Sequence, residues 1–137
     1  MLLDSNIVIY AAQPQNINLR TWISTNTIQV SALSKVEVLG YHKLTTEERV
    51  LFEEFFANII ILPITTAIIE KAIQLRQPKR MSLGDSIIAA TAIVNQLPIA
   101  THNVKDFQWI SQIDVIDPLM LWTRSDFYGE FGGDRLK

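Results

Sequence analysis

The sequence predicts an α/β fold, a three-layer α/β/α sandwich with a central, mostly parallel sheet. Short apolar or β-branched segments alternate with longer segments of helical periodicity, an order typical of parallel strands joined by crossover helices. The chain has 137 residues, of which 48% are hydrophobic and 19% are charged, and these values suit one folded domain. It contains no cysteine, which excludes disulfides and thiolate zinc sites.

Strands are expected where short apolar or β-branched runs end at a polar residue or a proline. In chain order, the expected strands are residues 1–3, 27–31, 59–62, 98–101 and 113–116. The first ends at Asp4, and Pro63 and Pro118 close the third, which we expect to be buried, and the fifth. Proline closes a strand because it cannot donate a hydrogen bond to the neighbouring strand.

Helices are expected between the strands, where apolar residues recur with the spacing of one helix face. In chain order, they are residues 5–12, a piece ending near residue 24, residues 32–44, a helix capped at residue 45 or 46, residues 65–75, residues 82–96, and a helical turn over residues 103–109. Pro14 separates the first two helices, because proline breaks the helical hydrogen-bond pattern. Ile17, Trp22 and Ile23 of the second helix are expected in the core.

The composition changes after Pro118, so we expect one domain over residues 1–118 and a C-terminal extension or tail over residues 119–137. Three of the five glycines lie in the last nine residues, among several aromatic residues. A flexible tail and a segment that docks on a partner both remain open, and the aromatic side chains are the reason to consider the second.

Charge and hydropathy exclude several classes of protein. The net charge is −2, so no overall positive field draws this chain to nucleic acid, and any such contact needs a local patch or a bound metal. The longest apolar run is the six residues 7–12, whereas a membrane span needs about 20. Asp4 and Asn6 stand where a signal peptide would be apolar, so we expect a cytoplasmic protein.

Four acidic residues are expected at the carboxyl edge of the sheet, where open parallel sheets bind their ligands. They follow a predicted strand or lie near the start of the next helix, and they are Asp4, Glu37, Asp85 and Asp106. Clustered carboxylates repel one another unless a cation is present. Hard oxygen ligands suit Mg²⁺, with Mn²⁺ as a substitute, and such an ion can activate water against a phosphodiester.

Helix capping explains each of these acids separately. The pairs with the spacing of a capping box are Ser34 with Glu37, Ser82 with Asp85, and Asn103 with Asp106, while Asp4 can itself be an N-cap. Capping does not require the four acids to converge on one edge. The shared edge therefore favours a metal site over capping alone.

Four segments of the chain resemble PIN-domain ribonucleases, and most closely the VapC-type toxins of toxin–antitoxin pairs. They are residues 2–6 (LLDSN), 34–40 (SKVEVLG), 83–92 (LGDSIIAATA) and 101–107 (THNVKDF). The segments stand in the family's order, and the resemblance extends from residue 1 to about residue 118. It implies a PIN-like nuclease domain there, with Mg²⁺-dependent endoribonuclease activity.

The resemblance also implies roles for individual residues. The acidic, metal-binding residues would be Asp4, Glu37, Asp85 and Asp106, and the residues that orient ligands or substrate would be Asn6, Thr101 and Asn103. The family's toxins often form homodimers and are silenced by a cognate VapB-like antitoxin. The basic loop that contains Lys79 and Arg80 could follow an RNA backbone or could simply be solvated.

Three other functions compete with that of an RNA-cleaving toxin. A housekeeping PIN nuclease in RNA processing and a non-catalytic PIN-like RNA-binding module remain alternatives. A phospho-acceptor receiver module is excluded, because it needs an acidic pair after the first strand and an aspartate after a middle strand. Here Asp4 stands alone, and residues 59–63 end without an acid.

Overall fold

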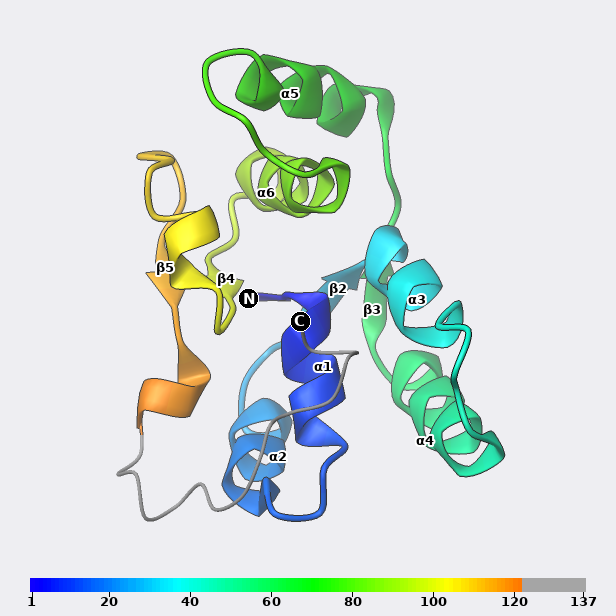
Figure 1. The fold of residues 1–137 in the computed structure, drawn as a ribbon. Helices are drawn as coiled ribbons and strands as arrows, with labels where there is room; N and C mark the ends of the chain where they lie inside the picture. The colour runs from blue at the N-terminus through cyan, green and yellow to red at the C-terminus, as the bar shows by residue number, and fades with distance from the viewer. Residues whose placement is uncertain (122–137) are drawn as a thin grey trace.

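The computed structural model describes residues 1–121, which form a five-stranded parallel sheet between two layers of helices (Figure 1). The strands are β1 (Leu2–Leu3), β2 (Gln29–Ser31), β3 (Ile60–Leu62), β4 (Ile99–Ala100) and β5 (Val115–Ile116), in the spatial order β3-β2-β1-β4-β5. Every neighbouring pair is parallel, so all strands end at the same edge. The predicted three-layer α/β/α fold is confirmed.

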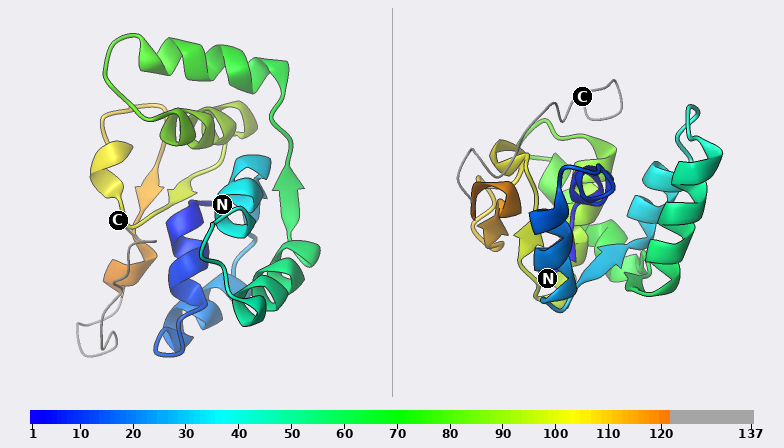
Figure 2. Two further views of the ribbon diagram at one scale, coloured as in Figure 1. Left: turned by 45° about the vertical axis from the view of Figure 1, so that its right-hand side comes forward. Right: turned by 90° about the horizontal axis from the view of Figure 1, so that it is seen from below.

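The helices divide between the two faces of the sheet (Figure 2). They are α1 (Ser5–Ala11), α2 (Ile17–Ser24), α3 (Ala32–Leu39), α4 (Thr46–Ala57), α5 (Thr66–Arg76) and α6 (Leu83–Asn95), with 3-10 turns η1 (Val104–Asp106) and η2 (Pro118–Leu121). Helices α1 to α4 cover one face, and α5 and α6 cover the other. Alternation along the strands fills both cores: Leu3 and Val30 enter the first, Leu2 and Ile99 the second.

Three local expectations were wrong. Ile17 is 63% exposed, and Leu19 supplies the fully buried residue of α2 instead. The third helix ends at Leu39 rather than near residue 44, with Gly40 at its C-cap. Strand β3 lies at an edge of the sheet and leaves Ile60 57% exposed, so it is not a buried strand.

The core extends slightly beyond the expected domain boundary. Leu119, in η2, is 5% exposed and belongs to the same core cluster as α1 and α2. The rest of the expected C-terminal extension, residues 122–137, lies outside the described residues. Among residues 1–121, no helix is both long and apolar enough to cross a bilayer.

Candidate functional site

Asp4 lies at the carboxyl end of β1, in the centre of the sheet, and is only 7% exposed. It is the N-cap of α1, and its Oδ1 accepts a hydrogen bond from the Ser5 backbone amide at 2.8 Å. Its Oδ2 accepts a second from the Thr101 hydroxyl, also at 2.8 Å. Thr101 follows β4, the neighbouring strand, so two adjacent strand ends fix this carboxylate.

Glu37 reaches the same edge from α3. The Ser5 hydroxyl donates to Glu37 Oε1 at 2.7 Å and lies 2.9 Å from the Ser34 hydroxyl. The N-cap of α3 is Ser31, whose side chain accepts from the Leu33 amide, so Ser34 lies inside the helix. The proposed capping box of Ser34 and Glu37 is therefore wrong, and Ser5 holds the carboxylate of Glu37.

Asp85 stands in the first turn of α6, where Ser82 is the N-cap and accepts a hydrogen bond from the Asp85 amide at 3.0 Å. The turn approaches α3 closely at Gly84. A Cβ atom at Gly84 would stand 3.3 Å from Glu37 Oε2 and would press on that carboxylate. Glycine therefore allows the start of α6 and the acid of α3 to share one site.

One cavity of about 250 Å³ joins three of the four predicted acids. We call it the acidic cavity, and its polar lining residues are Asp4, Ser5, Asn6, Glu37, Tyr41, Asp85 and Asn103. The side-chain oxygen of Asn6, one of these lining residues, is buried and accepts no hydrogen bond from the described residues. Buried polar atoms are seldom left unpaired, which makes this oxygen unusual among the polar atoms of the site.

The acidic cavity holds negative charge at a cost. Burial raises the pKa of Asp4 to about 6, and the carboxylates of Asp85 and Glu37 add to the shift, while the hydrogen bonds from Thr101 and Ser5 oppose it. Burial also raises the pKa of Asp85, and the nearby charges of Asp106 and Glu37 raise it further. A bound cation would favour both ionised forms.

The donor set suits a hard divalent cation. Carboxylate oxygens and the unpaired Asn6 amide oxygen are the ligand types that Mg²⁺ prefers. Within residues 1–121, however, no three acidic or histidine side chains are arranged to hold one ion by themselves. Mg²⁺ is usually held by one or two carboxylates, with water and substrate completing its shell.

The fourth predicted acid, Asp106, lies in η1 and lines a neighbouring groove of about 400 Å³. We call it the cationic groove, and its charged and aromatic lining residues are Arg76, Lys79, Arg80, Asp85, Lys105, Asp106 and Trp109. Asn103 makes no side-chain cap at η1, so the capping interpretation is wrong for Asp106. Lys79 and Arg80 thus stand beside Asp85 and Asp106, rather than over the acidic cavity.

Two residues of the site were missed in the sequence. Ser5 follows Asp4 directly and is the first residue of α1. This position indicates that its hydroxyl lies at the same strand end as Asp4, where it binds Glu37. Tyr41 lines the acidic cavity just after α3. The sequence placed Tyr41 inside a longer helix, so nothing indicated where its side chain would lie.

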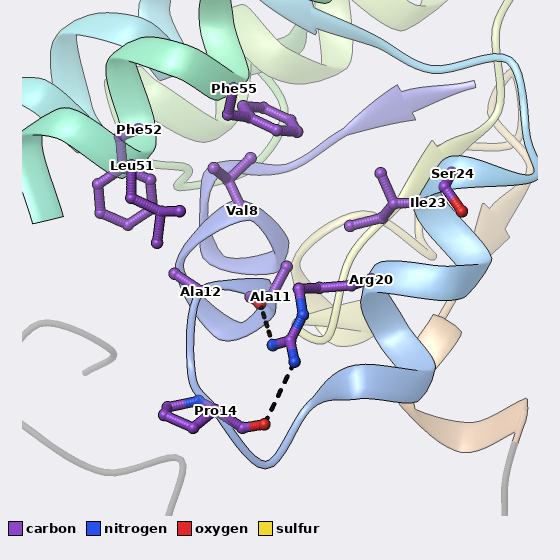
Figure 3. A pocket seen from close by; sticks show the side chains of 10 residues that line it. All are labelled: Val8, Ala11, Ala12, Pro14, Arg20, Ile23, Ser24, Leu51, Phe52 and Phe55. Atoms are coloured by element: carbon purple, nitrogen blue, oxygen red, sulfur yellow. Dashed lines mark hydrogen bonds between the residues drawn. The ribbon is translucent and has the colours of Figure 1, made fainter.

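A third feature, the apolar groove, lies between α1, α2 and α4 and has a volume of about 420 Å³ (Figure 3). Its lining residues are Val8, Ala11, Ala12, Pro14, Arg20, Ile23, Ser24, Leu51, Phe52 and Phe55. Arg20 ties α2 to the end of α1 through hydrogen bonds to the carbonyl oxygens of Ala11 at 2.9 Å and Pro14 at 3.3 Å. A second hollow of about 630 Å³ continues past Ile23 and Phe55.

This parallel α/β sandwich carries acids from separate elements at its strand ends, and its sequence matches a known family over the same region. The model described as the PIN domain matches residues 1–111. The chain belongs to the PIN domain family.

Three relatives show what this chain is similar to. Ribonuclease VapC10 of Mycobacterium tuberculosis is 30% identical over 122 residues, which cover 82% of this chain and 90% of that protein. A chain of a toxin–antitoxin complex from Klebsiella pneumoniae is 27% identical, with a TM-score of 0.69 over 85% of this chain and 96% of that one. A chain of DNA-bound VapBC from Salmonella typhimurium has a TM-score of 0.76 at 20% identity, covering 85% and 96%, and supports the fold.

Proposed function

We propose that this protein is a Mg²⁺-dependent endoribonuclease and the toxin of a type II toxin–antitoxin pair, acting on cellular RNA in the cytoplasm. The observation that carries the proposal is the acidic cavity, in which Asp4, Glu37 and Asp85 meet beside an unpaired Asn6 oxygen. Family membership and the resemblance to a ribonuclease give the class of reaction.

The residues of the site have distinct roles in this proposal. A divalent ion, Mg²⁺ or Mn²⁺, would supply a polarised water and would neutralise charge on a phosphoryl oxygen when bound. The acids that would hold it, directly or through water, are Asp4, Glu37, Asp85 and Asp106. Ser5 and Thr101 keep the carboxylates of Glu37 and Asp4 in place through the hydrogen bonds described above.

Substrate contacts are assigned to the polar and basic residues around these acids. Asn6 and Asn103 line the acidic cavity and can orient a phosphate or ribose. The Thr101 hydroxyl donates a hydrogen bond to Asp4 and accepts one from the Asn103 amide at 3.0 Å. Thr101 therefore orients these two residues and need not contact the substrate itself. Lys79 and Arg80 offer positive charge to the RNA backbone.

Two protein partners belong to the proposal. The apolar groove would take a segment of a VapB-like antitoxin, because apolar side chains from three helices line it and a similar chain occurs in a toxin–antitoxin complex. A homodimer is supported by the open edge strand β3 and by the exposed Ile69 and Ile73 of α5. Both surfaces lie outside the acidic cavity.

The test is RNA cleavage by the purified protein in Mg²⁺ and in EDTA. We expect cleavage only with Mg²⁺ or Mn²⁺, and a loss of about 100-fold or more in Asp4→Asn, Glu37→Gln and Asp85→Asn, because a misplaced reacting group costs about that much. Asp114→Asn is the matched control, since Asp114 precedes β5 at the opposite edge of the sheet. Undiminished cleavage in EDTA would contradict the metal mechanism.

Growth during expression separates the toxin from the alternatives. We expect expression to stop growth, and co-expression of the antitoxin to restore it. Healthy growth with soluble, active nuclease would indicate a housekeeping enzyme. A wild-type protein that binds RNA and never cuts it would indicate a non-catalytic module.

A further inference from the structure

The cationic groove is built by two segments that are distant in the sequence. The end of α5 contributes Arg76, and the loop from α5 to α6 contributes Lys79 and Arg80. The region of η1 contributes Lys105 and Trp109. The four basic side chains are all exposed. On a chain of net charge −2, they form a local positive patch, which is one of the two features, a patch or a bound metal, that the sequence predicts for contact with nucleic acid.

These basic side chains form no salt bridge with the acids of the same groove among residues 1–121. Those acids are Asp85 and Asp106. Arg76 donates through Nε to the carbonyl oxygen of Met81 at 3.2 Å, and its terminal nitrogens remain available. The groove therefore presents its cations to an anionic ligand.

Trp109 adds an aromatic surface to the same groove. Its indole nitrogen donates to the Asp106 carbonyl oxygen at 3.1 Å, and this hydrogen bond fixes the edge of the ring. Lys79 Nζ lies 5.1 Å from the ring centroid. Such a contact is weak at an exposed site, so a base can displace the lysine, whose charge then reaches a neighbouring phosphate. Cations beside an aromatic face are typical of a surface that binds single-stranded nucleic acid.

The groove adjoins the acidic cavity, because Asp85 lines both. We propose that the cationic groove holds the RNA segment next to the scissile phosphate, with one unpaired base stacked on Trp109 and the adjoining phosphates against Lys79, Arg80 and Lys105. This inference rests on the proposed function and adds a substrate-positioning surface to it. The metal-free acidic cavity repels phosphate, whereas the groove does not need metal to attract it.

The proposal predicts RNA binding in the absence of metal. The probe is a fluorescein-labelled oligouridylate, and its affinity is measured by anisotropy in EDTA over a series of salt concentrations. We expect Lys79→Ala combined with Arg80→Ala to weaken binding about tenfold. The slope of log affinity against log salt concentration should become shallower by about 0.7 for each phosphate contact removed. Arg49→Ala combined with Lys71→Ala removes the same charge outside the groove and should change neither quantity.

Stacking on Trp109 gives a second, optical readout. We expect the oligonucleotide to quench part of the tryptophan fluorescence of the wild type, and Trp109→Leu to lose that quenching and to bind about tenfold more weakly. Trp109→Phe should keep most of the affinity, because it retains an aromatic face. A leucine variant that binds and quenches like the wild type would overturn the stacking role.

The outcomes distinguish this inference from the proposed function. Wild-type binding that needs Mg²⁺, or groove variants that bind as tightly as the control pair, would overturn the groove even if all of them still cleave RNA with Mg²⁺. Metal-independent binding that is lost in the groove variants, in a protein that never cleaves RNA, would contradict the nuclease and leave the groove as an RNA-binding surface.

Discussion

At the scale of a single residue, Asp4 is a carboxylate whose ionised form is disfavoured by burial. Its carboxylate is buried, and two hydrogen bonds do not fully compensate, so its pKa is raised to about 6. The same hydrogen bonds fix the position of both oxygens. Burial and fixed geometry together are what a site needs if a cation is to replace water around a carboxylate.

The raised pKa of Asp4 predicts a pH dependence of stability in the metal-free protein. The folded-state pKa lies above the usual value of 3.8, so the folded protein holds this proton more tightly than the unfolded chain. The free energy of unfolding should therefore rise as the pH falls from about 7 towards about 4, by up to about 3 kcal/mol from this group. Asp85 shifts in the same direction.

Urea unfolding in EDTA at a series of pH values measures this dependence. In Asp4→Asn the increase should be much smaller, because the titrating group is gone, whereas Asp114→Asn should keep it. A wild-type protein whose stability falls steadily over that pH range would show that Asp4 is not held in a desolvated site.

Asp85 predicts a second stability effect, in which repulsion competes with the helix dipole. An acid in the first turn of a helix usually stabilises it by roughly 0.3–1 kcal/mol. Here burial and the charges of Asp106 and Glu37 raise its pKa, so the ionised form carries a net cost. We expect Asp85→Asn to melt at a higher temperature than the wild type in EDTA at neutral pH.

Mg²⁺ should reverse that order. The wild type should gain stability from millimolar Mg²⁺, because an ion that binds only the folded state stabilises it, and Asp85→Asn should lose most of this gain. Two melting curves for each protein, with EDTA and with Mg²⁺, make the comparison. If Asp85→Asn melts at a lower temperature than the wild type in EDTA and is stabilised by Mg²⁺ as much as the wild type, Asp85 only stabilises the start of its helix and is not part of a metal site.

At the scale of secondary structure, two helix starts position two of the acids. Asp4 is the N-cap of α1, which begins directly after β1, and Ser82 caps α6 at the turn that carries Asp85, whereas Glu37 is the sixth residue of α3. The same local chemistry operates far from the site in α4. There the Thr45 hydroxyl accepts from the Glu48 amide, and Glu48 Oε1 accepts from the Thr45 amide, both at 3.1 Å.

Removing the α4 cap should therefore destabilise the fold without touching the site. We expect Thr45→Ala to lower the free energy of unfolding by about 1 kcal/mol, because the Glu48 amide loses its acceptor. Thr46→Ala is the neighbouring control and should cost less, since Thr46 follows the cap. Thermal melts measure both variants, and equal losses would show that the capping box contributes nothing particular.

At the scale of the whole molecule, the apolar groove is separate from the other two proposed recognition surfaces. The acidic cavity and the cationic groove share Asp85, whereas the apolar groove lies among α1, α2 and α4. An inhibitor seated in the apolar groove would therefore need a further segment to reach the acids. The antitoxin can accordingly be separated from catalysis by mutation.

Leu51→Asp tests that separation. Leu51 lines the apolar groove and is 48% exposed, so a charge there should block an apolar partner while leaving the core intact. We expect the variant to cleave RNA normally, to lose the antitoxin in co-purification, and to stop growth even when the antitoxin is present. Val50→Asp, on the same helix but outside the groove, is the control. Unchanged antitoxin binding by Leu51→Asp would place the partner elsewhere.

The sequence by itself determined the order of the elements and the edge at which chemistry gathers. Strand segments have a period of two and helices one of 3.6, so alternation between them can be read locally. Parallel strands end at one edge, and Asp4 could therefore be placed there from its position after an apolar run. Ser82 as the cap of α6 was equally local.

Only the tertiary structure decided which side chains meet and what lies between them. The hydrogen bond from Ser5 to Glu37 joins residues 32 positions apart, and the approach of α6 at Gly84 depends on how two helices pack. The same packing sets Asp106 in the cationic groove beside Asp85, and it leaves Ile17 in solvent. These contacts depend on side-chain volumes and on the angles at which helices pack. The periodicity of a single segment of sequence encodes neither of these quantities.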